Sequence, residues 1–200
     1  MENPAKHYNI IFEPLFNYLE LLQKIALEDK NSIAEILEYR TVKEGEVLLE
    51  EGKIANEIFF VSDGVLKITS INDRGNEVIH FFFSENQFCT ILKSFTENTP
   101  STDRIQAACD AEVIVFKKNT LQSLYLSLPY FQKILDTIFQ QSLLNKVELR
   151  NFYLGEDATA RYQKFIVRQS NIASRVSQTD IASYLGIAKQ SLSRIKKNAF

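Results

Sequence analysis

The chain is poor in the residues from which metal and redox sites are built. Among its 200 residues are two cysteines, two histidines, one methionine and no tryptophan. Cys89 and Cys109 are too far apart in the sequence for a zinc knuckle, and an iron–sulfur cluster needs about four protein ligands. A cysteine that serves neither purpose is typically a small buried hydrophobic residue. We therefore predict no metal site and no resident cofactor.

Long apolar runs are missing as well. Nowhere do 18 uncharged apolar residues follow one another, so the sequence predicts no helix that crosses a membrane. The apolar patch near the N-terminus is interrupted by Glu13 and Pro14 and has no small-residue cleavage site, unlike a secretory signal. Hydrophobic residues still make up 45% of the chain, which is ample for a buried core. We expect a soluble cytoplasmic protein with no membrane partner.

Glycine is also scarce, and its positions are informative. Four of the six glycines, Gly45, Gly52, Gly64 and Gly75, separate short runs rich in Val, Ile and Phe. From Thr41 onward these runs are VLLE, EIFFVS, VLKITSI, EVIHFFF and AEVIVF. Glycine confined to the breaks between strands is typical of tight hairpins. The pattern predicts a compact antiparallel sheet closed on itself, which is a β-roll or jelly roll.

Helical patterns flank the β region. Residues 13–38 carry apolar residues at helical spacing, with a predicted break at residues 29–32. After the strands, residues 120–127 predict one helix, and Pro129 is placed to open a much longer one. Residues 155–159 predict a hinge, in which Asp157 caps the helix that follows.

The long helix after Pro129 has two apolar flanks. One contains Phe131, Leu135, Ile138, Ser142, Asn145, Leu149 and Phe152, and the other contains Ile134, Phe139, Leu143 and Val147. One flank can pack against the small β domain, so we expect the other to pack against the same helix of a second copy. We assign Leu135, Ile138, Phe139 and Leu149 to this homodimer contact. The alternative is that both flanks are buried within one chain.

Residues 179–197, TDIASYLGIAKQSLSRIKK, predict a helix-turn-helix. Gly186 supplies the turn, Ile181 and Leu185 lie at helical spacing before it, and Leu192 and Ile195 pack the second helix back on the first. The other face of the second helix carries side chains that can contact bases and phosphates. These are Lys189, Gln190, Ser193, Arg194, Lys196 and Lys197. A solvated surface helix is the alternative interpretation of the same pattern.

The distribution of charge favours the DNA-binding interpretation. Residues 161–200 contain eight Lys or Arg residues and one acid, a net charge of +7. Residues 1–160 contain 15 basic and 24 acidic residues, a net charge of −9. A basic terminal region on an acidic body is typical of a protein that presents one end to a polyanion.

The order of these parts resembles the cyclic-AMP receptor protein and fumarate-nitrate regulator (Crp/Fnr) family of bacterial transcription factors. The segments that carry the resemblance are KEGEVLLEEG at 43–52, IFFVSDGVLKI at 58–68, DRGNEVIHFF at 73–82, the strand around 107–113, and ATARY at 158–162 with the helix-turn-helix. The segment ATARY and the helix-turn-helix look like the variant of this family common in Bacteroidetes-type bacteria.

The resemblance implies an α+β fold in three parts. Residues 1–128 are expected to form a cyclic-nucleotide-binding-like β-roll (a double-stranded β-helix or jelly roll) with flanking helices. Residues 129–155 would be the dimerisation helix and hinge, and residues 156–200 the helix-turn-helix domain. The implied protein is not an enzyme. It is a homodimeric regulator that binds a palindromic operator on double-stranded DNA and contacts RNA polymerase.

The resemblance also assigns roles within the helix-turn-helix. Lys189, Gln190 and Arg194 are expected to contact bases, with Ser191 and Ser193 at phosphates. Ser177, Gln178 and Thr179 would hydrogen-bond the DNA backbone at the start of the first helix. Ala188 departs from the family pattern because it stands where a Ser or Thr would cap the recognition helix. Many relatives carry a β-hairpin wing after that helix, and we expect none here because Phe200 follows closely.

The effector site departs further from the family pattern. Cys89 and Thr90 stand where a Gly-Glu pair would meet a ribose, and residues 99–101, Thr-Pro-Ser, stand where an Arg would pair with a cyclic phosphate. We therefore predict weak or no cyclic-AMP binding and an unknown small-molecule effector, if the roll binds one. The candidate effector residues are Cys89, Thr90, Ser101 and Arg104, although Arg104 suits a strand edge equally.

Three other interpretations remain open at this point. His80 could be an axial haem ligand, although a single strand histidine is more often packed or on the surface. A cupin-type metalloenzyme shares the β-roll, but its metal site usually needs two or three histidines with a carboxylate. A sensory adaptor whose degenerate helix-turn-helix binds protein instead of DNA is the other alternative.

Overall fold

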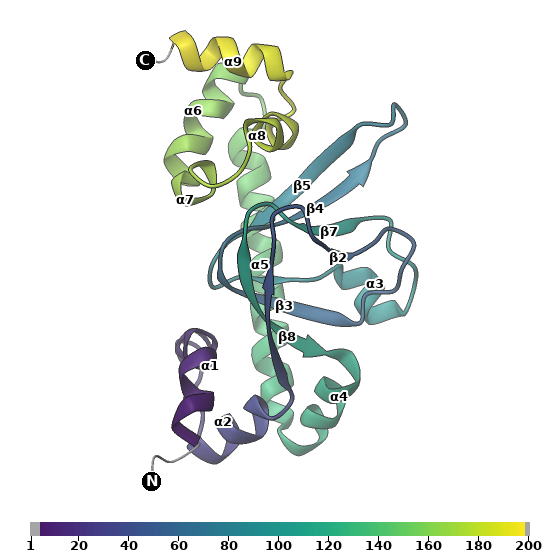
Figure 1. The fold of residues 1–200 in the computed structure, drawn as a ribbon, viewed down its shortest axis with the longest axis vertical. Helices are drawn as coiled ribbons and strands as arrows, with labels where there is room; N and C mark the ends of the chain where they lie inside the picture. Colours follow the sequence, from purple (N-terminus) through teal and green to yellow (C-terminus); the bar gives the residue numbers. More distant parts are fainter. Residues whose placement is uncertain (1–4, 199–200) are drawn as a thin grey trace.

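The computed structural model describes residues 5–198, and it places side chains from residue 10 to residue 197. The described chain forms a β-roll with helices at both ends, and one long helix runs along the whole molecule (Figure 1). The N-terminal helices are α1 (Ala5–Glu20) and α2 (Leu27–Ala34). No helix in this described part combines the length and the apolar composition that crossing a bilayer requires.

The β-roll consists of two four-stranded antiparallel sheets. The strands are β1 (Leu37–Val42), β2 (Val47–Leu49), β3 (Glu57–Asp63), β4 (Leu66–Ile71), β5 (Glu77–Phe83), β6 (Phe88–Cys89), β7 (Arg104–Ala107) and β8 (Ala111–Lys117), with the short helix α3 (Leu92–Glu97) after β6. The strand orders are β1-β8-β3-β6 and β2-β7-β4-β5. Phe59 lies opposite Val115 in the first sheet, and Ile68 lies opposite Ile105 in the second. All four residues belong to one buried cluster between the sheets.

The predicted β-roll is confirmed, with corrections to its strands. The five runs of Val, Ile and Phe form β2, β3, β4, β5 and β8. The strand expected around residues 107–113 is in fact two strands, because residues 108–110 form the turn between β7 and β8. The sheet begins at Leu37 and not at Thr41, so the last residues of the predicted N-terminal helical region belong to β1.

Glycine does occupy the turns, and Gly64 between β3 and β4 shows why. Its φ is +89°, a conformation that residues with a side chain rarely adopt. A Cβ at this position would lie 2.4 Å from the backbone oxygen of Asp110 and 2.5 Å from Cβ of Ala111. Only glycine therefore allows the β3–β4 turn to approach the start of β8.

The break between the first two helices was predicted at the wrong place. Residues 29–32 lie inside α2, and the chain leaves helix at residues 21–26 instead. Glu28 and Asp29 fall in the first turn of α2, where carboxylates interact favourably with the helix dipole. These acidic residues therefore mark the start of a helix and not a break.

The long helix α5 (Pro129–Tyr153) follows α4 (Lys118–Ser127), and proline stands in its first turn as predicted. Its N-terminal half packs in the chain's own core through Phe131, Ile134, Leu135 and Ile138. Leu135 is 1% exposed and Ile138 is 4% exposed, so assigning them to a dimer contact was wrong. They instead join α1, α2 and the outer face of the β1-β8-β3-β6 sheet in one hydrophobic cluster.

The other two residues of the predicted dimer contact, Phe139 and Leu149, are half-buried. Phe139 packs against the same cluster, 6.4 Å from Phe88 between ring centroids. The apolar residues that α5 leaves exposed are in its C-terminal half: Leu143, Leu144 and Val147.

The C-terminal helices are α6 (Ala158–Arg168), α7 (Ser170–Ala173), α8 (Gln178–Leu185) and α9 (Lys189–Asn198). Gly155, with φ of +80°, makes the turn after α5. The predicted cap is confirmed, since the side chain of Asp157 accepts a hydrogen bond from the backbone N–H of Ala160 at 2.9 Å. The connection is shorter than the predicted 155–159, because Ala158 and Thr159 already belong to α6.

Candidate nucleic-acid interface

Helices α8 and α9 form the predicted helix-turn-helix. Gly186 ends α8 in the left-handed conformation, with φ of +63°. Ile181, Leu185 and Leu192 are buried, and Ile195 packs against the same cluster. This apolar seam fixes the angle between the helices and leaves the opposite face of α9 free.

The free face of α9 is basic. Lys189, Gln190, Ser191, Ser193, Arg194 and Lys197 are exposed, and Lys196 is half-buried. The helix carries four basic residues and no acidic one, and none of the four forms an ion pair with a carboxylate of a described residue. Helix α9 lies across the far end of the molecule, beyond α6 and α8 (Figure 1).

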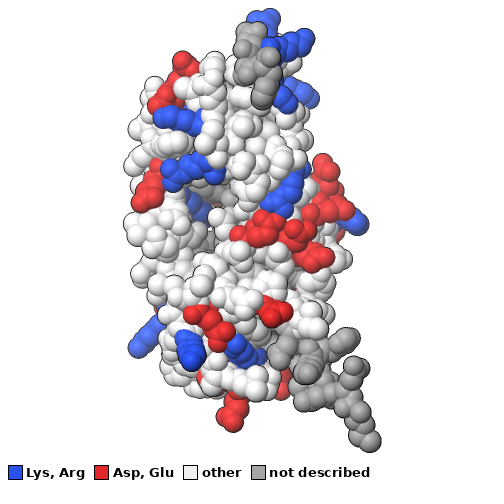
Figure 2. All heavy atoms as spheres, turned by 90° about the vertical axis from the view of Figure 1, so that its left-hand side faces the viewer, with Lys and Arg blue, Asp and Glu red and all other residues white. Residues whose placement is uncertain are grey.

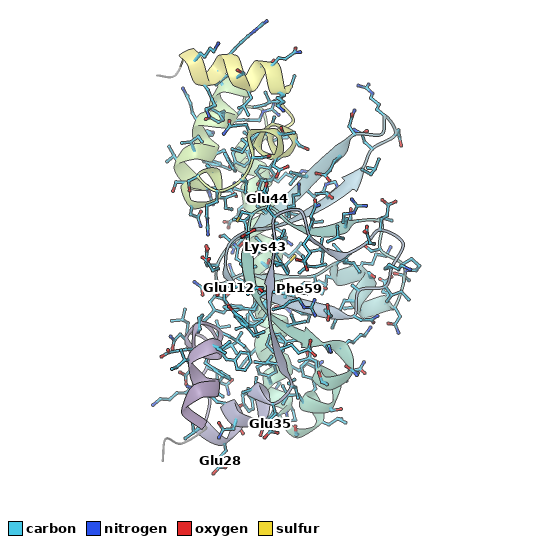
Figure 3. The ribbon with its side chains drawn as sticks, viewed as in Figure 1. Glu28, Glu35, Lys43, Glu44, Phe59 and Glu112 are labelled. Carbon is cyan, nitrogen blue, oxygen red and sulfur yellow. The ribbon has the colours of Figure 1, made fainter. Side chains whose placement is uncertain are left out.

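Figures 2 and 3, which both draw side chains, agree that positive charge lies at the α9 end of the molecule. Figure 2 shows Lys and Arg side chains at the extreme upper end, while the largest group of Asp and Glu lies near the middle of the molecule. In Figure 3 several side chains of α9 that end in nitrogen point away from the rest of the chain. The basic side chains of this helix are therefore presented to solvent.

The start of α8 also has the polar character that the sequence predicts. Ser177 caps the helix, because its Oγ accepts a hydrogen bond from the backbone N–H of Asp180 at 3.0 Å. The Ser177 hydroxyl keeps its own proton for donation, and the side chains of Gln178 and Thr179 are exposed. Asp180 is the one acidic residue of α8, and Lys67 forms an ion pair with it.

The helix-turn-helix is docked on the β-roll, which the sequence did not predict. The ammonium of Lys67 in β4 lies 3.0 Å from Asp180 in α8 and 3.1 Å from Glu77 in β5. The Lys67 side chain is only 9% exposed, so both contacts are largely shielded from water. This three-residue cluster joins the second sheet of the roll to the first helix of the DNA-binding motif.

A second ion pair links the same two parts. Arg175, just before α8, makes a bidentate pair with Glu85 after β5, with Nη2 and Oε2 at 2.8 Å. Hydrogen bonding to Arg175 lowers the pKa of Glu85 to about 2. Arg175 therefore contributes to docking, and its charge is not free for a polyanion.

Backbone and aromatic contacts complete the docking surface. The Ser183 hydroxyl of α8 donates to the backbone oxygen of Glu77 at 2.9 Å and accepts from the N–H of Ile79 at 3.1 Å. Phe82 of β5 lies 5.0 Å from Tyr184 of α8 between ring centroids. Ile79 and Phe82 are buried in the same cluster as Ile181. The roll and the helix-turn-helix thus share one hydrophobic core.

Comparison with known proteins agrees with this architecture. Residues 39–127 match the family model of the cyclic nucleotide-binding domain. The chain is 27% identical over 185 residues to the transcriptional activator protein anr of Pseudomonas aeruginosa, covering 86% of this chain and 74% of that protein. The chain therefore carries a cyclic nucleotide-binding domain and is a homologue of a bacterial transcriptional activator.

Two solved structures share the fold of this chain. The c-di-GMP responsive global regulator CLP of Xanthomonas campestris matches with a TM-score of 0.67 and 18% identity, covering 87% of this chain and 91% of that one. A regulator of the crp/fnr family from Eubacterium rectale matches with a TM-score of 0.66 and 17% identity, covering 91% and 87%. The resemblance to the Bacteroidetes-type variant stays a prediction.

The four candidate effector residues do not form one site. Cys89 is fully buried in the core between the sheets, and burial raises the pKa of its thiol to about 12. Ser101 donates to the backbone oxygen of Asp103 at 2.7 Å, and Arg104 pairs with Glu50 at 3.0 Å. Only Thr90 borders the cavity between the roll and α5. The prediction that these four residues line one effector pocket is therefore wrong.

That cavity, of about 480 Å³, occupies the angle between the roll and the middle of α5. Its lining is mostly apolar and includes Ile68, Phe88, Leu92, Phe139 and Val147. Thr90 turns its hydroxyl away toward the backbone oxygen of Glu57, to which it donates at 2.9 Å. The lining also contains the charged residues Asp103, Lys146 and Arg150, so the cavity offers both apolar and charged groups to a ligand.

The histidine that could have been a haem ligand is already engaged. His80 Nε2 lies 2.7 Å from the Ser70 hydroxyl and 3.6 Å from Asp103. His7 lies among the residues whose side chains are not described. Within the described part of the chain, no group of three or more His, Cys, Asp or Glu side chains could hold a metal ion. The cupin alternative therefore has no donor set among these residues.

Proposed function

We propose that this chain is a homodimeric DNA-binding transcriptional regulator that inserts α9 into the major groove of a palindromic operator. The single observation that carries the proposal is the exposed basic face of α9 at the end of the molecule. Four cations without a nearby acid suit the phosphate backbone, whose neutralisation releases counterions and stabilises the complex. Arg194, Gln190 and Lys189 can donate to base edges at the same time.

The start of α8 supplies the second part of the interface. Ser177, Gln178 and Thr179 lie around the helix N-terminus, where exposed N–H groups and the helix dipole favour a phosphate. Because Lys67 forms an ion pair with Asp180, the carboxylate of α8 repels a phosphate less strongly. These residues would position the protein on the DNA backbone while α9 contacts the bases.

The exposed flank of α5 supports the homodimer. Leu143 is 61% exposed, Leu144 58% and Val147 51%, although each is large and apolar. Their spacing is that of residues which pack between parallel helices. A second copy packed along this flank would place two α9 helices on one side of the dimer. They would then contact half-sites about 34 Å apart, one turn of the DNA helix.

Replacing Leu143 by Glu is expected to shift the chain from dimer to monomer and to abolish high-affinity binding to a two-half-site operator. The reason is that a charge in an apolar helix seam must be desolvated without a partner. Sedimentation equilibrium checks the oligomeric state. The matched control is Leu126→Glu, since Leu126 is 88% exposed on α4 and is not part of the exposed flank of α5. A Leu143→Glu chain that stays dimeric at low micromolar concentration would contradict this assignment.

Two variants of α9 separate base contacts from phosphate contacts. Arg194→Ala is expected to cost about 1 to 3 kcal/mol on the operator and to relax the preference at one base pair. Lys197→Ala should weaken binding to every sequence alike and lower the salt slope by about one. Operators selected from a random oligonucleotide pool, followed by competition binding to single-base variants, measure both effects. If both variants lower the affinity for all sequences equally, Arg194 does not contact bases.

The alternative function, an adaptor with a degenerate helix-turn-helix, predicts a different result. Binding of the unmodified chain to duplex DNA should then be absent or independent of salt. A DNA-binding regulator instead loses affinity steeply as salt rises, because each phosphate contact releases counterions. RNA polymerase is the expected protein partner of the regulator, and cyclic AMP is not the expected effector. Binding measured with and without cell extract would reveal whether another small molecule is needed.

A further inference from the structure

A second cavity lies where the roll, the long helix and the helix-turn-helix meet. Its volume is about 480 Å³. β5, α5, α6 and α8 all contribute to its walls, and the lining residues are Ile79, His80, Phe81, Lys146, Leu149, Arg150, Tyr153, Leu154, Arg161, Tyr184 and Leu185. It adjoins the cavity bordered by Thr90 and shares His80, Phe81, Lys146 and Arg150 with it, but only the second cavity is also lined by the helix-turn-helix. None of the lining residues is acidic.

The cavity brings together three cations that lack counter-ions. Lys146, Arg150 and Arg161 form no ion pair with a carboxylate in residues 10–197. The Nε of Arg161 is buried and has no hydrogen-bond partner among these residues. A buried donor without a partner costs free energy, which a bound anion could recover.

Lys146 is a second charged group of the cavity without a carboxylate partner among the side chains that the structure describes. Its ammonium lies 4.7 Å from the ring centre of Phe81 and 4.6 Å from that of Phe83. Burial lowers the pKa of Lys146. The two rings stabilise the cation only partly, so an anion at this point would gain a charge-assisted contact.

Aromatic side chains form the rest of the wall. Tyr153 and Tyr184 lie 6.3 Å apart between ring centroids, nearly perpendicular to each other, and Phe81 faces them from β5. Both tyrosine hydroxyls accept from the Gln169 amide, at 2.9 Å and 3.3 Å, which fixes the rings. Fixed aromatic walls beside unpaired cations match a ligand with a planar ring and a negative group.

We propose that this cavity is a binding site for a small organic anion that combines an aromatic ring with a phosphate or carboxylate group. Arg161 and Arg150 hold the anionic group, and the tyrosines and Phe81 hold the ring. On α5 the site is lined by Lys146, Leu149 and Tyr153, and also by Arg150, which lies one turn beyond Val147 on the exposed flank. An Nη1 of Arg161 also lies 3.8 Å from where a Cβ on Gly186 would stand, so the ligand would bind next to the helix-turn-helix turn.

The test uses phenyl phosphate as the probe, with the full chain and without DNA. Isothermal titration calorimetry should show saturable binding of one phenyl phosphate per chain, with weaker binding of inorganic phosphate and none of benzyl alcohol. Arg161→Gln should weaken phenyl phosphate binding about tenfold, because it removes a charge-assisted contact. Arg150→Gln, at an exposed position that tolerates substitution, should weaken it in the same direction.

The matched control is Arg168→Gln, on the same helix as Arg161. Arg168 is exposed, lies over the Phe152 ring at 4.8 Å and does not line the cavity, so its substitution should leave phenyl phosphate binding unchanged. The proposal is overturned if phenyl phosphate does not saturate, or if all three variants bind it equally. If inorganic phosphate and phenyl phosphate bind equally well, the claim that the tyrosines and Phe81 hold the ring of the ligand is overturned. None of these results depends on DNA binding, so they are separate from the test of the proposed function.

Discussion

Phe165→Ala is expected to lower the free energy of unfolding by about 3 to 5 kcal/mol, the usual cost of removing a fully buried aromatic side chain. Phe165 in α6 is fully buried, and its ring lies 5.6 Å from Tyr184 between centroids. It belongs to the cluster that the roll shares with the helix-turn-helix. The cavity left by its removal would therefore loosen both the DNA-binding helices and their attachment. Urea unfolding followed by circular dichroism measures the change.

Val167→Ala is the control on the same helix. Val167 is 82% exposed, and its substitution should change stability by no more than about 0.5 kcal/mol. A second expected difference is in hydrogen exchange, which should rise in α8 for Phe165→Ala and stay unchanged for Val167→Ala. Equal stability losses for the two variants would mean that this cluster does not hold the domain together.

Lys67→Met should be the next most damaging change, with a loss of about 3 kcal/mol in stability. The methionine keeps most of the apolar stem but leaves Asp180 and Glu77 facing each other without the ammonium. The Asp180 side chain is only 13% exposed, so water cannot fully replace the lost partner. Urea unfolding measures the loss, and hydrogen exchange in α8 and β5 should increase.

A double variant separates the missing charge from other effects. Adding Asp180→Asn to Lys67→Met removes one of the two uncompensated carboxylates, so the double variant should be more stable than Lys67→Met alone. Lys53→Met, at an exposed lysine of the roll, is the control for a general effect of losing a positive charge. If Asp180→Asn does not restore any stability, the Lys67 cluster does not hold α8 on the roll.

The parts of the structure that depend on local sequence were predicted well. The glycines marked the turns because positive φ requires them, and the helix-turn-helix was recognised because its apolar spacing and Gly186 lie within twenty residues. Strand β6 was missed because it has only two residues. Arg104 opens strand β7, where its pairing with Glu50 depends on distant neighbours.

Contacts between distant segments could not be predicted in the same way. Lys67 and Asp180 are 113 residues apart, and nothing in either neighbourhood marks the other as its partner. The periodicity of α5 correctly indicated two apolar flanks, but one sequence cannot say which flank the chain covers itself. Leu135 and Ile138 were therefore assigned to a dimer, although α1 and the sheet already bury them. The cavity beside Arg161 arises from four elements and has no motif of its own.

The contact between Ser183 and β5 covers part of an edge of the sheet. β5 is an outer strand of its sheet, and outer strands with free N–H and C=O groups can recruit strands from other molecules. The Ser183 hydroxyl forms hydrogen bonds with the backbone oxygen of Glu77 and the backbone N–H of Ile79 on this edge. Tyr184 packs against Phe82 of the same strand. The helix-turn-helix thereby covers part of an outer strand that would otherwise be open to pairing with another molecule.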